Sequence, residues 1–234
     1  MVKKIIVKRE CSLRFQEAIW LYNALREYPP EELSPCINIG SSTKYFRHYS
    51  KPHISKYVIN PLLASGIKLI NFDLKEGDGI DISGDIYDKV TFDLLKKINS
   101  KALICSNMLE HIMNRRLFAK KCSALLGNNG LIFITVPYSY PYHRDPIDTL
   151  YRPKPEDIIN LFPEFSLVKS EIITASSYFD DLKKAGSIKI LMRAGRLLLP
   201  IYKPKSWISH LHRLLWLFRP YTVTCVVLQK SKTQ

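Results

Sequence analysis

The residues best suited to bind a nucleotide-like ligand follow directly after apolar runs of the sequence. Gly40 comes after the run 36–39, and Asp73 comes after the run 67–72. Glycine permits a sharp turn and a close approach of a ligand to the backbone. An acid after the second strand of a nucleotide-binding sheet accepts hydrogen bonds from ribose hydroxyls. This pattern predicts a ribose-bearing ligand, although an ordinary strand-to-helix turn stays an alternative because dinucleotide sites use three glycines and this turn has one.

Apolar runs alternate with amphipathic stretches along most of the chain. Strands are predicted at 36–39, 67–72, 79–82, 102–105 and 131–136, and helices at 15–27, 57–64, 91–98, 115–126 and 153–161. Strands that alternate with helices form a parallel sheet with helices on both faces. The β-branched, apolar run 222–228 predicts a late antiparallel strand at or near the sheet edge. The fold class is therefore α/β, a Rossmann-like, doubly wound, mostly parallel sheet in a three-layer α/β/α arrangement.

Two stretches in the second half of the chain carry a resemblance to a known family. They read Asn107-Met108-Leu109-Glu110-His111 and, after a helix, Leu126-Gly127-Asn128-Asn129-Gly130 followed by an apolar strand and Pro137. This order resembles the fourth-to-fifth-strand half of class I, type 11-like S-adenosylmethionine-dependent methyltransferases. Residues 35–165 are similar to that family in order and spacing. The turn after the first strand departs from it, since the family often has an acid where Asn38 stands and glycine where Ser42 stands.

The resemblance implies S-adenosylmethionine as the cofactor and assigns its contacts. The cofactor-binding residues it implies are Asn38, Gly40, Ser41, Ser42, Asp73, Asp85, Ile86 and Asn107. In this assignment the turn 40–42 borders the methionine part, and Asp73 holds the ribose. Asp85 and Ile86 contact the adenine, and Asn107 lines the floor near the sulfonium. Two alternatives stay open, because Asp85 also suits a helix cap and Asn107 also suits a turn.

Methyl transfer to an oxygen requires an acceptor in line with the methyl group and a base that takes its proton. The loop 138–153 is dense in aromatic residues, carboxylates and prolines and follows a central strand, so we expect it to form the acceptor pocket. His143 is the first candidate for the base, with Asp145 to orient it or replace it, and His111 is the second. The alternative for His143 is a hydrogen bond that only shapes the loop.

A metal site is the other option at residues 107–111. Some ubiquinone and small-RNA O-methyltransferases carry E-x-x-E-H here, whereas this chain has Asn107 in place of the first acid. Glu110, His111 and an approaching His143 make a poor site for a hard divalent ion. We therefore assign no metal ligand, and helix capping and a packed turn are the alternative roles of Glu110 and His111.

The formal net charge of +14 is unevenly distributed. From Leu182 onward there are eleven Lys or Arg and no Asp or Glu, so the first 181 residues carry only +3. A basic C-terminal segment predicts an anionic partner, such as nucleic acid, a phosphorylated substrate or a lipid surface, and basic amphipathic helices within 183–219 suit an anionic membrane surface. The alternatives are RNA, a solvated face, a cap on the domain itself and a homodimer face.

Spacing and composition also give the domain organisation and the compartment. We expect one domain made of a helical N-terminal extension (1–34), a methyltransferase core (35–175), a basic amphipathic helical insertion (176–220) and a final strand and tail (221–234). The five cysteines are odd in number and contain no CxxC pair. This excludes a disulfide framework or a zinc site and fits a reducing compartment. The expected location is the cytoplasm, peripheral to the inner face of the membrane if the basic helices bind there.

The expected activity is O-methylation of a sugar or glycan precursor. Loops similar to 138–153 occur in methyltransferases found among surface-polysaccharide genes, and this likeness suggests the acceptor. An RNA methyltransferase is the first alternative, because the tail is basic and aromatic residues of the loop could stack on bases. A non-catalytic, methyltransferase-like scaffold at a membrane surface is the second, supported by the degenerate glycine turn. A nicotinamide-dependent oxidoreductase is the third, and the missing glycines count against it.

Overall fold

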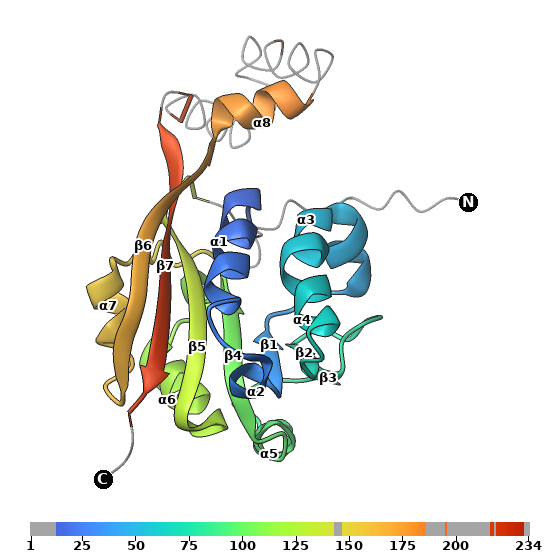
Figure 1. Cartoon of the computed structure of the whole chain (residues 1–234). Helices are drawn as coiled ribbons and strands as arrows, with labels where there is room; N and C mark the ends of the chain where they lie inside the picture. The colour runs from blue at the N-terminus through green and yellow to red at the C-terminus, as the bar shows by residue number, and fades with distance from the viewer. Residues whose placement is uncertain (1–12, 143–146, 186–194, 196–215, 218, 232–234) are drawn as a thin grey trace.

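The computed structural model describes residues 13–142, 147–185, 195, 216–217 and 219–231. The described residues form one seven-stranded sheet with the order β3-β2-β1-β4-β5-β7-β6 (Figure 1). Its strands are β1 (Cys36–Ile39), β2 (Leu69–Asp73), β3 (Ile82–Ser83), β4 (Ser100–Ser106), β5 (Leu126–Ser139), β6 (Phe165–Ser177) and β7 (Pro220–Lys230). Strand β7 runs antiparallel to both β5 and β6, and the pairs from β3 to β5 are parallel. The predicted fold class, including the late antiparallel strand, is confirmed.

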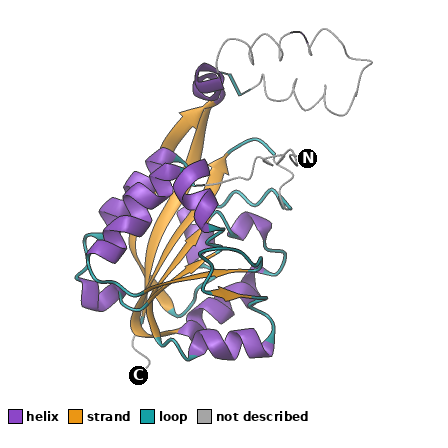
Figure 2. Cartoon of the chain, turned by 90° about the vertical axis from the view of Figure 1, so that its right-hand side faces the viewer, coloured by secondary structure: helices purple, strands orange, loops and turns teal. Residues whose placement is uncertain are grey.

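Both faces of the sheet are buried, because helices cover each side of it (Figure 2). On one face, alternate residues of the strands pack with α5 (Lys89–Lys96), α6 (Arg115–Leu125) and α7 (Pro155–Ile159). On the other face they pack with α1 (Phe15–Leu25), α3 (Pro52–Ile54), the π-helical turn Ser55–Ile59 and α4 (Asn60–Ala64). Strand β5 shows this division, since Ile132 and Ile134 belong to the first core cluster and Leu131 and Phe133 to the second. This is the period-two burial expected of strands covered on both faces.

Several predicted boundaries shift for local reasons. The strand predicted at 79–82 is only Ile82–Ser83, because Gly79 has a φ of +75° and the Ile80 N–H closes a turn onto Gly77. The helix predicted at 91–98 begins at Lys89, since the Asp88 side chain accepts the N–H of Thr91 as an N-cap. The helix expected from residue 57 is part of a longer helical stretch that starts at Pro52.

Strand β6 was not anticipated, and it changes the picture of the sheet edge. It pairs with β7 along its whole length and forms the edge, so β7 lies one strand inside it. Most β6 side chains are exposed or half-buried. The strand therefore lacks the apolar run that marks the interior strands.

The remaining helices flank the sheet at its ends. Helix α2 (Pro30–Leu33) precedes β1, and α8 (Tyr178–Ala185) continues from the end of β6 beyond the sheet. Among the described residues, none of the helices combines the length and the apolar character needed to cross a bilayer. Most of the basic stretch 183–219 lies outside the described residues, and the four-segment division of the chain stays a prediction.

Candidate active site

A cavity of about 460 Å³ opens at the carboxyl edge of the parallel strands. Small-molecule sites are commonly about 300–1,000 Å³. The eight residues predicted to bind the cofactor all line this cavity: Asn38, Gly40, Ser41, Ser42, Asp73, Asp85, Ile86 and Asn107. The parallel register explains their meeting, because β1, β2 and β4 end side by side. Their individual contacts with a cofactor stay predictions.

The turn after β1 and the end of β2 are tied together at the cavity. Gly40 has a φ of +72° and Ser42 a φ of +56°. The N–H groups of Gly40 and Ser41 donate to the carbonyl of Phe72 at 2.9 and 3.1 Å. A carboxylate oxygen of Asp73, Oδ2, accepts the N–H of Ser42 at 2.7 Å. Each strand end thus fixes the neighbouring loop and shapes the cavity between them.

Asp73 keeps the capacity that a ribose would need. Its Oδ1 accepts the N–H of Lys75 at 3.0 Å and its Oδ2 the N–H of Ser42 at 2.7 Å. An ionised carboxylate has about four lone-pair positions. Two backbone bonds therefore leave each oxygen one further acceptor position, while the same bonds fix the direction of the carboxylate.

The adenine end of the predicted site lies after β3. Ile86 is buried and belongs to the core cluster beside α5 and α6. Asp85 is exposed, and its Oδ1 accepts the N–H of Tyr87 at 2.9 Å. The N-cap of α5 is Asp88 and not Asp85. The helix-cap alternative for Asp85 therefore does not apply to α5, and the Asp85 carboxylate stays at the cavity wall.

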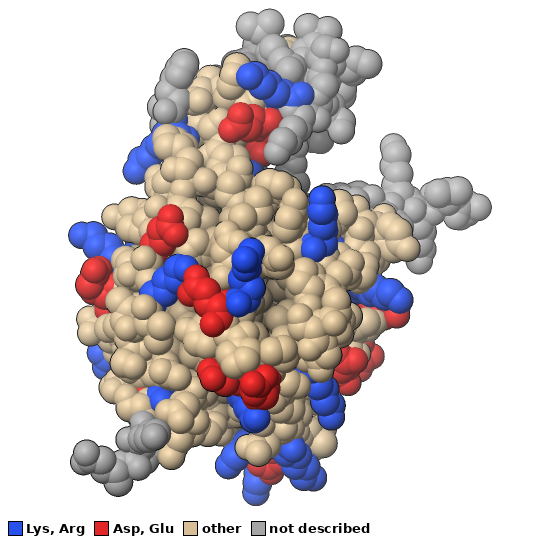
Figure 3. Space-filling view, viewed as in Figure 1, with Lys and Arg blue, Asp and Glu red and all other residues tan. Residues whose placement is uncertain are grey.

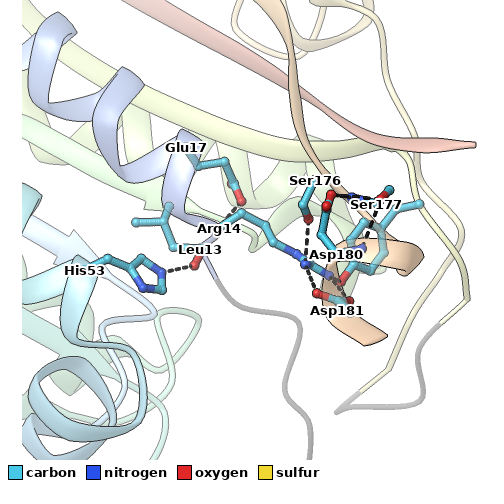
Figure 4. Close-up of polar contacts among 9 residues, drawn as sticks. Leu13, Arg14, Glu17, His53, Ser176, Ser177, Asp180 and Asp181 are labelled. Carbon is cyan, nitrogen blue, oxygen red and sulfur yellow. Dashed lines mark hydrogen bonds and ion pairs between the residues drawn. The ribbon is translucent and has the colours of Figure 1, made fainter. Parts of the chain in front are cut away.

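Asn107 lines the cavity in a left-handed turn, with a φ of +51°. Its Nδ2 donates to Glu17 Oε1 at 3.1 Å, so helix α1 holds this side chain in place. Glu17 is almost fully buried and also accepts the N–H of Arg14 at 2.6 Å (Figure 4). Burial raises the pKa of Glu17 to about 7.

His111 is the predicted base that the structure brings to the cavity wall. Its Nδ1 lies 2.6 Å from the carbonyl oxygen of Ile147. A carbonyl only accepts, so the proton sits on Nδ1 and Nε2 is the basic nitrogen. Nε2 lies 3.8 Å from Oε1 of Glu110. Glu110 is fully buried, neither of its carboxyl oxygens has a hydrogen-bond partner among the described residues, and burial raises its pKa to about 8. His143 and Asp145 lie outside the described residues.

Other polar groups near His111 fix the loop before α7. The Arg152 guanidinium forms two hydrogen bonds with the buried carboxylate of Asp148, at 3.0 and 2.7 Å. The N–H and hydroxyl of Thr149 donate to the carbonyl of Glu110 at 2.9 and 2.8 Å. Paired bonds of this kind hold their segment firmly, so Ile147 and His111 keep their relative position. Within the described ranges no three His, Cys, Asp or Glu side chains could hold a metal ion.

Three residues that line or support the cavity were missed from the sequence. Glu17 lies on the apolar face of its helix with Leu21 and Ala24, and an acid at that spacing was a visible signal. Met108 packs on Gly40, where an added Cβ would lie 2.3 Å from the Met108 sulfur. Arg47 is buried against the turn after β1. The positions of Met108 and Arg47 depend on contacts between loops, which periodicity does not reveal.

Comparisons with known proteins bear on the fold. No protein-family model matches the chain, and none of the curated proteins does. A solved structure described as a sarcosine dimethylglycine methyltransferase from Galdieria sulphuraria has a TM-score of 0.51 at 11% identity, over 92% of this chain and 86% of that one. The chain has the Rossmann-like methyltransferase fold. A SAM-dependent methyltransferase from Archaeoglobus fulgidus gives 0.50 at 15% identity, over 91% of this chain and 94% of that one.

The same fold also occurs in a protein with a different activity. The cyclase SpnF has a TM-score of 0.50 at 11% identity, over 92% of this chain and 82% of that one. The fold therefore indicates where a ligand binds, and the residues at the site must carry the functional argument.

Proposed function

We propose that the chain is an S-adenosylmethionine-dependent methyltransferase, with the cofactor in the cavity at the carboxyl edge of β1, β2 and β4. The observation that carries the proposal is the pairing of Asp73 with the Gly40 turn across one open cavity. Gly40 adds no side chain at the wall, and an added Cβ would collide with Met108. The Asp73 carboxylate has acceptor positions left for two hydroxyls. These features fit an adenosine and a methionine tail.

The bound cofactor would supply an electrophilic methyl group, and the chain would supply position and a proton acceptor. His111 would take the proton of an acceptor hydroxyl at Nε2 as the oxygen–methyl bond forms. The Ile147 carbonyl keeps the other proton on Nδ1. Glu110, 3.8 Å from Nε2, would stabilise the resulting imidazolium when ionised. The loop that contains His143 and Asp145 stays the first predicted source of a base.

For the acceptor we propose a hydroxyl of a sugar or glycan precursor. The support is the sequence likeness of loop 138–153 together with the place where that loop begins, at the end of β5 beside the cavity strands. An RNA acceptor and a non-catalytic scaffold remain the competing proposals. Transfer of a labelled methyl group to glycan precursors, with RNA offered in parallel, separates the three.

Replacement of Asp73 tests the cofactor site itself. We expect Asp73→Ala to weaken S-adenosylmethionine binding at least about tenfold in calorimetry, because two hydrogen bonds to a charged acceptor are lost. Asp93→Ala, an exposed acid on α5, is the matched control and should bind as the unmodified protein does. If Asp73→Ala retains full affinity, the ribose does not lie at Asp73.

A further inference from the structure

Arg47 connects the two loops that border the cofactor end of the cavity. It lies in the π-helical turn Phe46–Ser50, and only 3% of it is exposed. Its Nη1 donates to the carbonyls of Ser41, at 3.1 Å, and of Ser42, and its Nη2 donates to the carbonyl of Gly79 at 2.7 Å. Arg47 is not among the described residues that line the cavity. It therefore acts on the loops and not on a ligand.

Ser42 needs such support because of its backbone conformation. Its φ of +56° lies in the left-handed region, which residues other than glycine rarely adopt. The peptide groups on both sides of Ser42 are held, since Asp73 accepts its N–H at 2.7 Å and Arg47 donates to its carbonyl. Ser42 stands where the resembling family often has glycine, which would adopt this conformation without strain.

The neighbouring loop is shaped to receive the guanidinium. Gly79 has a φ of +75°, and a Cβ there would lie 2.6 Å from Cβ of Lys44 and 2.9 Å from Nη2 of Arg47. The N–H of Lys44 donates to the carbonyl of Asp78 at 2.8 Å and ties the same two segments a second time. Burial lowers the pKa of Arg47, while the carboxylates of Asp81, Asp73 and Asp78 oppose that effect and favour the charged form.

We propose that Arg47 is a positioning residue for the cofactor. It holds Ser42 in the left-handed conformation, and so keeps the turn 40–42 open for the methionine part of S-adenosylmethionine. Hydrogen bonds from the arginine offset the backbone strain that a second glycine, at position 42, would avoid. This inference rests on the proposed function, because the turn is assigned to that cofactor.

A double-mutant cycle between Arg47 and Ser42 tests the proposal. Lysine at 47 keeps the charge but lacks the planar fork that reaches three carbonyls. We expect Arg47→Lys to weaken S-adenosylmethionine binding about five- to thirtyfold in calorimetry, the scale of the left-handed penalty. Ser42→Gly on the unmodified background measures the direct effect of removing the serine side chain, and the cycle subtracts that effect. Ser42→Gly on the Arg47→Lys background should restore most of the affinity, which a purely structural role of Arg47 would not produce.

Two further variants keep the outcome decisive. Gly79→Ala would place a Cβ 2.6 Å from Cβ of Lys44 and 2.9 Å from Nη2 of Arg47 in a left-handed residue, so it displaces the receiving loop from both side chains and should also weaken binding. Arg116→Lys, an exposed arginine on α6, is the matched control and should bind as the unmodified protein does. Unchanged affinity in Arg47→Lys, or no rescue by Ser42→Gly, would overturn the proposal.

Amide hydrogen exchange separates this proposal from the proposed function. If the unmodified protein does not bind S-adenosylmethionine, the cofactor assignment fails, and the holding role is then judged without cofactor. In that case we still expect Arg47→Lys to speed exchange of the Ser42 N–H relative to Arg116→Lys. Equal exchange in the two variants would show that Arg47 does not hold the turn.

Discussion

Gly40 is the residue whose backbone the cavity depends on most directly. Its φ is +72°, whereas Gly127 has no positive φ and open space where a Cβ would be. We expect Gly40→Ala to lower the free energy of unfolding by about 1–2 kcal/mol, the cost of a left-handed alanine. The clash with Met108, whose Sδ would lie 2.3 Å and Cγ 2.9 Å from the added Cβ, should add to this cost. Gly127→Ala is the control, and a chemical denaturation curve that moves as far as that of Gly40→Ala would contradict this explanation.

Glu110 should make stability depend on pH. Its pKa is raised to about 8, chiefly by burial, with the carboxylates of Glu17 and Asp148 acting in the same direction and Arg152 opposing them. The folded protein therefore holds a proton that the unfolded chain releases near pH 4.5. Stability is full below that pH and falls as the pH rises through the folded pKa, by at most about 1.4 kcal/mol per pH unit.

Glu110→Gln should flatten this dependence, because the amide does not ionise. We expect the melting temperature of the unmodified protein to fall more between pH 5 and pH 9 than that of the variant. The comparison uses the change of melting temperature with pH and not the melting temperature itself, since burial of the glutamine amide also lowers stability. Glu76→Gln, at an exposed position, should keep the slope of the unmodified protein. An unchanged slope in Glu110→Gln would show that Glu110 is ionised throughout.

At the residue scale, the sequence was informative where a side chain follows a strand directly. Gly40, Asp73 and Asn107 could be predicted because the strand ends place them, whatever the rest of the chain does. Glu17 and Arg47 act through partners about 90 and 32 residues away in the chain. No spacing rule links such residues, so their roles required the structure.

At the scale of elements, one arginine joins the start of α1 to α8, the helix that runs into the basic stretch 183–219. Nη1 of Arg14 donates to Asp181 on α8 at 2.9 Å and to Ser176 on β6 at 2.8 Å (Figure 4). Nη2 donates to the hydroxyl of Tyr140 at 2.6 Å. On the other side, His53 Nε2 contacts the carbonyl of Leu13 at 2.7 Å, and Leu13 lines the cavity.

Loss of this junction should loosen α8 without unfolding the sheet. We expect Arg14→Ala to lower the free energy of unfolding by about 1–3 kcal/mol, because a partly buried charged group loses several hydrogen bonds. Hydrogen exchange should rise most in Tyr178–Ala185. Lys169→Ala removes a more exposed ion pair with Glu27 and should cost less than about 1 kcal/mol. Equal exchange of α8 in both variants would contradict this role of Arg14.

Elements were predictable in proportion to their burial. The interior strands β1, β4 and β5 have continuous apolar runs, since both of their faces are covered. Strand β6 is largely exposed, and polar residues interrupt its pattern, so pairing with β7 decides its conformation. Helix α5 begins two residues before its predicted start. The prediction missed this start because Asp88 was not recognised as the N-cap.

At the scale of the whole molecule, charge is spread without one dominant patch on the face shown in Figure 3. Lys and Arg side chains alternate with Asp and Glu over its coloured residues. This agrees with the small net positive charge of the first 181 residues, because most of the excess of Lys and Arg lies after Leu182. Binding of 183–219 to an anionic membrane, to RNA or to a second copy of the chain stays a prediction, as does the cytoplasmic location.

The central claim is that the cavity between Gly40 and Asp73 binds S-adenosylmethionine. A crystal structure with S-adenosylhomocysteine at saturating concentration tests it most directly. We expect the ribose hydroxyls within hydrogen-bond distance of the Asp73 carboxylate, the adenine beside Asp85 and Ile86, and the homocysteine along the turn 40–42. An empty cavity in that crystal, or a ligand bound elsewhere on the molecule, would contradict the claim.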